Sequence, residues 1–219
     1  MKVSIVSLDF AGVITPKNFI DYFWLELIPY AYSLKHCVEL SKAKRIVYEE
    51  YSRVGVDKVE WYLIEYWAKR FSIEEYTPQL LDMAYTKISI YPDVLNVLPK
   101  LHDRVNKIII VTNTTIPFIN LFFKAYPEVE KYINRIYSCV THYNLPRKTK
   151  EFYIKVVEDL HVKPYEIVHV GDDPLYDFKI PRSIGIYAFI LIRDKGKYRN
   201  VCEYEQYIIK SLNDLLEIV

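Results

Sequence analysis

Short apolar runs rich in valine, isoleucine and tyrosine recur along the chain. These runs are continuous rather than alternating, which is typical of strands buried on both faces of a parallel sheet. Between two of them, Phe152, Val156 and Leu160 recur at the spacing of one helix face. Strands that alternate with helices predict an α/β fold with a doubly wound, Rossmann-like parallel sheet. The predicted strands are Val3–Leu8, Lys107–Thr112, Arg135–Val140, Glu166–Val170 and Tyr187–Ile192.

The end of the chain carries a helical spacing as well. Tyr204, Ile208, Leu212 and Leu215 follow one another at the intervals that place residues on one face of a helix. The pattern therefore predicts a C-terminal helix.

The alternation of strands and helices stops between residues 16 and 90, where helical signals replace it. Ser72 and Glu75 have the spacing of a capping box, and Thr77-Pro78 is typical of an N-cap followed by a first-turn proline. A stretch of this length is long for a loop. We therefore expect an α/β core from residues 1–15 and 91–219, interrupted by a helical subdomain at residues 16–90. This insertion contains all three tryptophans of the chain.

Composition excludes several classes of protein. Lysine plus arginine number 29 and aspartate plus glutamate 28, so no charge excess indicates a nucleic-acid partner. No window of about 18 apolar residues lacks charge, so we expect no membrane span. Cys37, Cys139 and Cys202 lie far apart and form no metal-binding or redox pair, which favours free thiols in the cytoplasm. The oligomeric state stays open.

Polar residues follow the predicted strands at the points where they end. Asp9 follows the first strand, Thr112 and Asn113 end the second, and Gly171-Asp172-Asp173 end the fourth. A basic group, residues 147–150, opens the helix before that fourth strand. Because the carboxyl ends of parallel strands share one edge of the sheet, these groups should meet there. Carboxylates, a hydroxyl and cations at one edge suit a divalent cation and a phosphate.

Four segments, in this order and spacing, resemble the haloacid dehalogenase superfamily. Its first motif, Asp-x-Asp-Gly-Thr/Val, is similar to residues 9–13 except at Ala11, and its second, a strand ending in Thr or Ser, is similar to Thr112. Its third motif, a Lys or Arg, is matched best in register by Arg147, with Lys148 as the choice if the register is off by one. Its fourth motif is matched by Gly171, Asp172, Asp173 and Asp177, and residues 91–94 look like the return from cap to core. The resemblance covers nearly the whole chain and places the helical insertion where this superfamily has a cap.

The resemblance implies a nucleophile and a metal site. Asp9 would attack phosphorus and form an aspartyl phosphate. Mg²⁺ would bind the Asp9 carboxylate, the backbone carbonyl of Ala11 and Asp172. Asp173 or Asp177 would support the ion directly or through water.

The resemblance also implies a phosphate site. Thr112 and the backbone N–H of Asn113 would hold phosphate oxygens, and Arg147 would balance the developing charge. Gly12 would let the backbone pass close to the ligand. The implied activity is that of a Mg²⁺-dependent hydrolase acting on a small phosphorylated or phosphonate substrate under an aromatic-rich cap that excludes water.

Ala11 is the departure from the superfamily pattern. In its phosphatases this position holds an aspartate that protonates the leaving alcohol and then activates water, and losing such a group typically costs ~10²–10⁴ in rate. The alanine fits a substrate that needs no such acid. Phosphonoacetaldehyde hydrolase, which is similar in having Asp-x-Ala-Gly and a third-motif arginine, forms an imine with a cap lysine. Lys35, Lys42 and Lys44 are the candidate lysines here.

Ala11 is also compatible with two hypotheses that need no cap lysine. In one, the chain is a phosphatase for good leaving groups, such as acyl or aryl phosphates, or it borrows an acid from His142 or His36. In the other, it is a catalytically impaired protein that binds phosphate and metal. A haloacid dehalogenase proper fits less well, because those enzymes work without metal and carry an aromatic residue at the position of Ala11.

Overall fold

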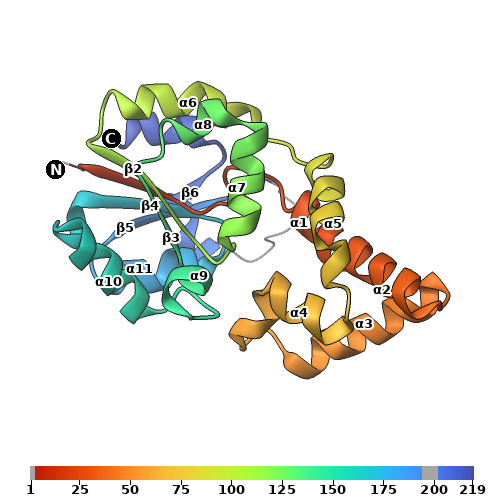
Figure 1. Cartoon of the computed structure of the whole chain (residues 1–219). Coiled ribbons are helices and arrows are strands. Elements are labelled where there is room, and N and C mark those ends of the chain that lie inside the picture. Colours follow the sequence, from red (N-terminus) through yellow and green to blue (C-terminus); the bar gives the residue numbers. More distant parts are fainter. Residues whose placement is uncertain (1–2, 194–201) are drawn as a thin grey trace.

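The computed structural model describes residues 3–193 and 202–219. Six parallel strands form one sheet in the order β3-β2-β1-β4-β5-β6, which confirms the predicted α/β fold with a doubly wound sheet (Figure 1). The strands are β1 (Ile5–Leu8), β2 (Lys107–Thr112), β3 (Arg135–Ser138), β4 (Ile167–Gly171), β5 (Tyr187–Leu191) and β6 (Ile208–Ile209). The first five lie within the predicted runs or one residue beyond them, because buried apolar runs specify strands locally.

Eleven α-helices lie in the described residues. Those of the α/β core are α6 (Pro92–His102), α7 (Ile116–Ala125), α8 (Pro127–Glu130), α9 (Cys139–Tyr143), α10 (Lys150–Leu160) and α11 (Ile180–Arg182). Those of the 16–90 segment are α1 (Asn18–Tyr22), α2 (Ile28–His36), α3 (Leu40–Val54), α4 (Ile64–Phe71) and α5 (Thr77–Tyr85). None of these helices is long and apolar enough to cross a membrane, in the part of the chain that the structure describes.

Helices cover both faces of the sheet. Val6, Leu8 and Ile110 join one apolar core with α6 and α7, whereas Ile109 and Val111 join another with α10. Neighbouring residues of one strand thus point to opposite layers, as the pleat requires. Figure 1 shows α6, α7 and α8 on one side of the sheet and α10 and α11 on the other. The predicted α10 face is confirmed, since Phe152, Val156 and Leu160 are all buried.

The C-terminal helix predicted from Tyr204, Ile208, Leu212 and Leu215 is wrong. Two 3₁₀ segments, Cys202–Tyr207 and Leu212–Glu217, flank strand β6 instead. Ile208 and Ile209 extend to pair with β5, and the Ile192 N–H donates to the Ile209 carbonyl at 3.0 Å. Ladder hydrogen bonds at the edge of the sheet outweigh a helical spacing that carries little energy by itself.

The chain passes from the core into the helical segment and back through two stretches that lie side by side. The Thr15 hydroxyl donates to the Ser89 carbonyl at 2.7 Å, and the Tyr91 N–H donates to the Ile14 carbonyl at 3.2 Å. The two connections between this segment and the core are therefore adjacent. Helices α1 to α5 lie beyond the carboxyl ends of the strands (Figure 1).

The two helix-start signals predicted in this segment have different outcomes. The capping box at Ser72 is wrong, because Ser72 ends α4 in the left-handed region at φ 55°. Pro78 does lie in the first turn of α5, but the N-cap prediction for Thr77 is wrong, because Thr77 is the first helical residue and Tyr76 occupies the N-cap position.

Candidate active site

Three predicted strand-end residues meet over the middle of the sheet. Asp9 follows β1, Thr112 ends β2, and Asp172 follows β4. Because β1 lies between β2 and β4, the crossovers diverge here and leave a crevice, the usual ligand site of such sheets. A cavity of about 190 Å³, which we call the polar cavity, occupies it. Its lining comprises Asp9, Ala11, Lys17, Thr112, Asn113, Thr114, Arg147, Lys148, Asp172, Asp173, Tyr176 and Asp177.

Asp9 is held rigidly at the floor of the polar cavity. Its backbone N–H donates to the Val170 carbonyl at 2.8 Å, which ties the turn after β1 to β4. The side chain is buried, and Lys148 Nζ lies 3.1 Å from its Oδ1. Burial raises the pKa of Asp9, and the ammonium of Lys148 opposes that shift. A further cation at this place would favour the ionised form still more.

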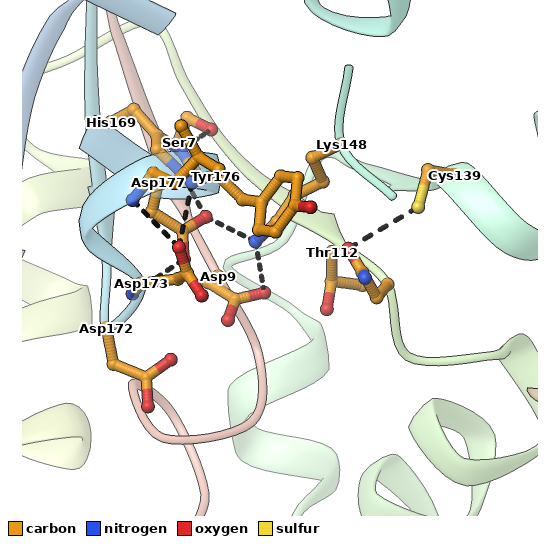
Figure 2. Close-up of polar contacts among 12 residues, drawn as sticks. Ser7, Asp9, Thr112, Cys139, Lys148, His169, Asp172, Asp173, Tyr176 and Asp177 are labelled. Atoms are coloured by element: carbon orange, nitrogen blue, oxygen red, sulfur yellow. Dashed lines mark hydrogen bonds and ion pairs between the residues drawn. The ribbon is translucent and has the colours of Figure 1, made fainter. Parts of the chain in front are cut away.

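Lys148, rather than Arg147, contacts the Asp9 carboxylate (Figure 2). Its ammonium bridges Asp9 and Asp177 and is buried. Burial would lower the pKa of Lys148, but the two carboxylates outweigh that effect and raise it. The ammonium therefore stays charged.

Arg147 lies at the rim of the polar cavity. Its guanidinium lies 5.3 Å from the centre of the Tyr176 ring, and its Nη2 lies 3.8 Å from Asp57 Oδ1. It lines the cavity with its side chain partly exposed. The sequence left open whether Arg147 or Lys148 is the third-motif cation. In the structure, Lys148 is the inner cation, beside Asp9, and Arg147 is the outer one, at the rim.

Asp177 is the buried hub behind Lys148. Its Oδ1 accepts from Lys148 Nζ and, at 3.0 Å, from His169 Nε2, and its Oδ2 accepts from the Asp173 N–H at 3.1 Å. Burial would raise the pKa of Asp177, but Lys148 and His169 outweigh it and hold the pKa well below its usual range. Asp177 therefore stays ionised and holds Lys148 in place.

His169 is a site residue that the sequence reasoning missed. Fully buried on β4, it lies opposite Ser7 of β1, whose Oγ is 2.8 Å from its Nδ1. A carboxylate only accepts hydrogen bonds, so the contact with Asp177 requires a proton on Nε2, and Nδ1 then accepts from the Ser7 hydroxyl. The available signal was a histidine inside the otherwise apolar run Ile167–Val170. Such a residue needs buried partners.

Two glycines allow the acidic turns to approach one another. A Cβ on Gly171 would clash with the Asp177 carboxylate. Gly12 has φ +98°, and a Cβ there would clash with the Asp172 carboxylate. Only glycine combines this backbone conformation with this proximity.

Thr112 and Asn113 shape the turn after β2. The Thr112 hydroxyl accepts from the Thr114 N–H at 3.1 Å. The Asn113 amide donates to the Pro146 carbonyl at 3.1 Å, and its Oδ1 accepts from the Cys139 thiol at 3.5 Å. The Asn113 side chain thus ties the β2 turn to the loop that precedes Lys148.

A cluster of three carboxylates could hold a metal ion. Asp9, Asp172 and Asp177 each offer an oxygen, and these oxygens lie within 4.8 Å of one another. Hard oxygen donors of this kind fit a divalent cation such as Mg²⁺. Asp172 also lies 2.9 Å from Lys17 Nζ. The Asp173 Oδ1 accepts from the N–H groups of Leu175 and Tyr176 at 2.8 Å and caps the next helical turn.

The candidate imine lysines and proton donors of the 16–90 segment point elsewhere. Lys35 pairs with Glu75 and Lys44 with Glu26, each at 2.7 Å. His36 Nε2 lies 2.9 Å from the Phe71 carbonyl. In the described part of the chain, the lysines that line the polar cavity are Lys17 and Lys148.

His142, the other candidate proton donor, is engaged inside its own helix. Its Nδ1 accepts from the Ser138 N–H at 3.2 Å, at the start of α9. Burial lowers the pKa of His142, which favours the neutral ring.

A second cavity of about 170 Å³ adjoins the polar one, and we call it the aromatic cavity. The two share Ala11, Lys17, Asn113 and Thr114. The other walls of the aromatic cavity are Ile20, Asp21, Trp24, Trp61, Tyr62, Thr115 and Phe118. Trp67, in contrast, is fully buried and stacks on Phe71 at 5.4 Å inside the helical segment. The tryptophans of the insertion thus divide between cavity wall and packing.

Solved structures with the same fold include proteins of several descriptions. A HAD phosphatase from Thermococcus onnurineus superimposes with a TM-score of 0.80 at 23% identity, over 98% of this chain and 97% of that one. A 2-haloacid dehalogenase from Pseudomonas syringae gives 0.72 at 15% identity, over 99% and 97%. YfnB from Bacillus subtilis, in a crystal structure bound to magnesium, gives 0.67 at 13% identity, over 100% and 99%. At these identities the likeness establishes the fold alone.

Family membership rests on the sequence. No protein of curated function matches the chain. Residues 3–185, which include every strand-end group described above, match the family of haloacid dehalogenase-like hydrolases. The chain therefore belongs to the haloacid dehalogenase-like hydrolase family.

Proposed function

We propose that this chain is a Mg²⁺-dependent hydrolase that takes the phosphoryl group of a small phosphorylated substrate onto Asp9 and then passes it to water. The observation that carries the proposal is the buried Asp9 carboxylate, which faces the polar cavity with Lys148 at 3.1 Å and Asp172 beside it. A buried nucleophile with an adjacent fixed cation and acidic metal ligands suits phosphoryl transfer.

Each residue has a definite task in the first step. An Asp9 oxygen attacks phosphorus, the bond from phosphorus to the leaving oxygen breaks, and the leaving group departs with that electron pair. Lys148 balances the charge on the phosphoryl oxygens, Thr112 and the Asn113 backbone N–H bind them, and Arg147 meets the substrate at the rim. A divalent ion held by Asp9, Asp172 and the Ala11 carbonyl would add positive charge, with Asp177 in support.

The second step releases the enzyme. Water attacks phosphorus, the bond to the Asp9 oxygen breaks, and phosphate leaves with the proton balance taken up by solvent. Ala11 supplies no proton in either step. Substrates whose leaving group is stable as an anion are therefore favoured.

We further propose that residues 16–90 form a cap over this chemistry. In support, side chains of this segment such as Trp24 and Trp61 and core side chains such as Phe118 line the same cavity. Closure of such a segment would exclude water. The near-neutral charge favours a small-molecule partner over a nucleic acid, and the cytoplasm remains our expectation for its location.

Phosphate release from acetyl phosphate, with Mg²⁺ and with EDTA, tests the proposal. Turnover should need Mg²⁺ and should vanish in Asp9→Asn, while the exposed Asp82→Asn serves as the matched control. If Mg²⁺ binds by calorimetry but no phosphate is released from acetyl or p-nitrophenyl phosphate, the chain is the impaired binding protein instead.

A further inference from the structure

We propose that the aromatic cavity holds the leaving group, so that the preferred substrate is an aryl phosphate with a single ring. This inference rests on the proposed function and specifies its substrate class. It starts from two observations. Aromatic rings line the second cavity, and Ala11, the alanine of the first motif, is part of the wall of that cavity.

The two cavities meet where a phosphate ester would join its leaving group. They share Ala11, Asn113 and Thr114, so a phosphoryl group over Asp9 places the ester oxygen at their common wall. The group beyond that oxygen then enters the aromatic cavity. Lys17, which pairs with Asp172, also lines both cavities and supplies a fixed positive charge at the junction.

The aromatic cavity has the walls and the size for one ring. Trp24 meets Phe118 edge to face at 5.8 Å, and Trp61 meets Tyr62 in the same way at 5.0 Å. A further ring can join such a set through offset or edge contacts. An apolar cavity of about 150 Å³ in another protein admits benzene, so about 170 Å³ is sufficient here.

Trp24 and Trp61 pack against the core and also line the aromatic cavity. Both are only partly buried and line the cavity, whereas Trp67 is fully buried in the helical segment. The Trp67 indole N–H donates to the backbone carbonyl of Trp61 at 3.0 Å, so the Trp61 side chain is not needed for that link. The Trp61 ring contacts Tyr51 and Tyr62 and also lines the aromatic cavity, where it can contact a ligand.

Ala11 suits the same substrate. A phenolate leaves without prior protonation far more readily than an alkoxide does, so an aryl ester needs no acid at residue 11. The alanine methyl also keeps the junction of the two cavities apolar at this position, where a carboxylate would add a charge next to the ester oxygen. Acyl phosphates satisfy only the first condition and simple alkyl phosphates neither.

The test separates ring recognition from leaving-group acidity. We would compare kcat/KM for phenyl phosphate with that for hexafluoroisopropyl phosphate, because that fluorinated alcohol is about as acidic as phenol. Phenyl phosphate should be preferred by about tenfold. Trp61→Ala should lower kcat/KM for phenyl phosphate by about tenfold more than for the fluoroalkyl and acetyl phosphates, and Trp61→Phe should retain the preference.

The control is Tyr165→Ala, an exposed aromatic residue remote from the cavities. It should behave as the unaltered chain on all three substrates. Thermal melts by circular dichroism would verify that each variant is folded.

Binding of phenylphosphonate and propylphosphonate in the presence of Mg²⁺ gives a readout that needs no turnover. Turnover of acetyl phosphate with equal kcat/KM for the phenyl and fluoroalkyl esters overturns the aryl inference and leaves the proposed function intact. Absence of any turnover, with phenylphosphonate bound about tenfold tighter than propylphosphonate, overturns the proposed function and supports the ring site. Equal loss of all activities in Trp61→Ala also contradicts the inference.

Discussion

The polar cavity and the aromatic cavity share Ala11 and Lys17 but are held together in different ways. In the polar cavity, Lys148 lies between Asp9 and Asp177, and Asp177 depends in turn on His169. In the aromatic cavity, the rings touch through edges and faces without charge. Removing one buried charge leaves its partner unbalanced, whereas trimming one ring removes only contact area. Single substitutions should therefore cause large losses of stability and activity in the polar cavity and small losses in the aromatic cavity.

The largest effect is expected at Lys148. Lys148→Met leaves Asp9 and Asp177 buried without their common cation, so the free energy of unfolding should fall by about 3–5 kcal/mol. Turnover should fall with it. Urea denaturation in EDTA measures the stability, and Arg147→Met is the matched control.

The Arg147→Met variant shows whether the loss of stability is specific to the buried cation. Because Arg147 is partly exposed and its carboxylate partner, Asp57, lies 3.8 Å away at an exposed position, its loss should cost less than about 1 kcal/mol. Equal costs for the two substitutions would remove the distinction between inner and outer cation.

A carboxylate introduced where the cavities meet should change selectivity. Ala11→Asp supplies the missing acid and base, so turnover of an alkyl phosphate such as glycerol phosphate should rise by up to about 10² relative to phenyl phosphate. Steady-state kinetics on both esters would measure the ratio. An unchanged ratio would show that leaving-group protonation does not limit this site.

His169 tests whether the buried support matters for the chemistry. In His169→Phe, Asp177 loses a donor and Ser7 loses its acceptor, at a cost of about 1–3 kcal/mol in stability. We expect kcat to fall more than KM changes, because Lys148 loses its fixed position while the cavity walls remain.

A variant that restores a donor should recover part of the loss. His169→Gln keeps an N–H near Asp177 and should regain part of kcat. His102→Gln, at an exposed position, is the control. If Gln and Phe behaved alike, His169 would act only as packing.

The smallest effect concerns a charged cluster outside both cavities. The Asp93 carboxylate accepts from Arg193, from the Ser211 hydroxyl and, at 2.8 Å, from the Leu212 N–H. Burial would raise the pKa of Asp93, but these bonds outweigh it and lower the pKa below the ordinary value of 3.8. A carboxylate with a lowered pKa contributes stability above its unfolded pKa and loses it as the pH falls through the folded pKa.

Asp93→Asn should therefore cost about 1–2 kcal/mol at about pH 6, and the difference from the unaltered chain should shrink toward about pH 2. Urea denaturation at several pH values measures it. A difference that does not depend on pH would show that the hydrogen bonds, and not the charge, hold the chain end.

The sequence was sufficient to predict which residues meet at the strand ends. Asp9, Thr112 and Asp172 follow apolar runs, and parallel strands bring their carboxyl ends to one edge whatever the details of the loops. It was insufficient for Lys148 and Arg147, since their placement depends on how residues 144–149 fold against Asn113 and Asp177. His169 was missed because only the fold brings its partners together. Ser7 lies on another strand, and Asp177 lies in the segment after β4.

The C-terminal segment shows the same limit. Its helical spacing was real, yet pairing with β5 drew Ile208 and Ile209 into a strand. A short amphipathic pattern contributes little free energy until it is packed, so the neighbouring edge of the sheet decided its form.

The sequence by itself determined the parallel α/β core, the helices between residues 16 and 90 and the acidic groups at the strand ends, because these follow from local patterns of apolar and polar residues. Only the tertiary structure decided that Lys148 is the inner cation, that His169 supports Asp177, and that Trp24 and Trp61 line a cavity while Trp67 packs a core. Such choices depend on contacts between residues distant in the chain, where burial and charge balance act together.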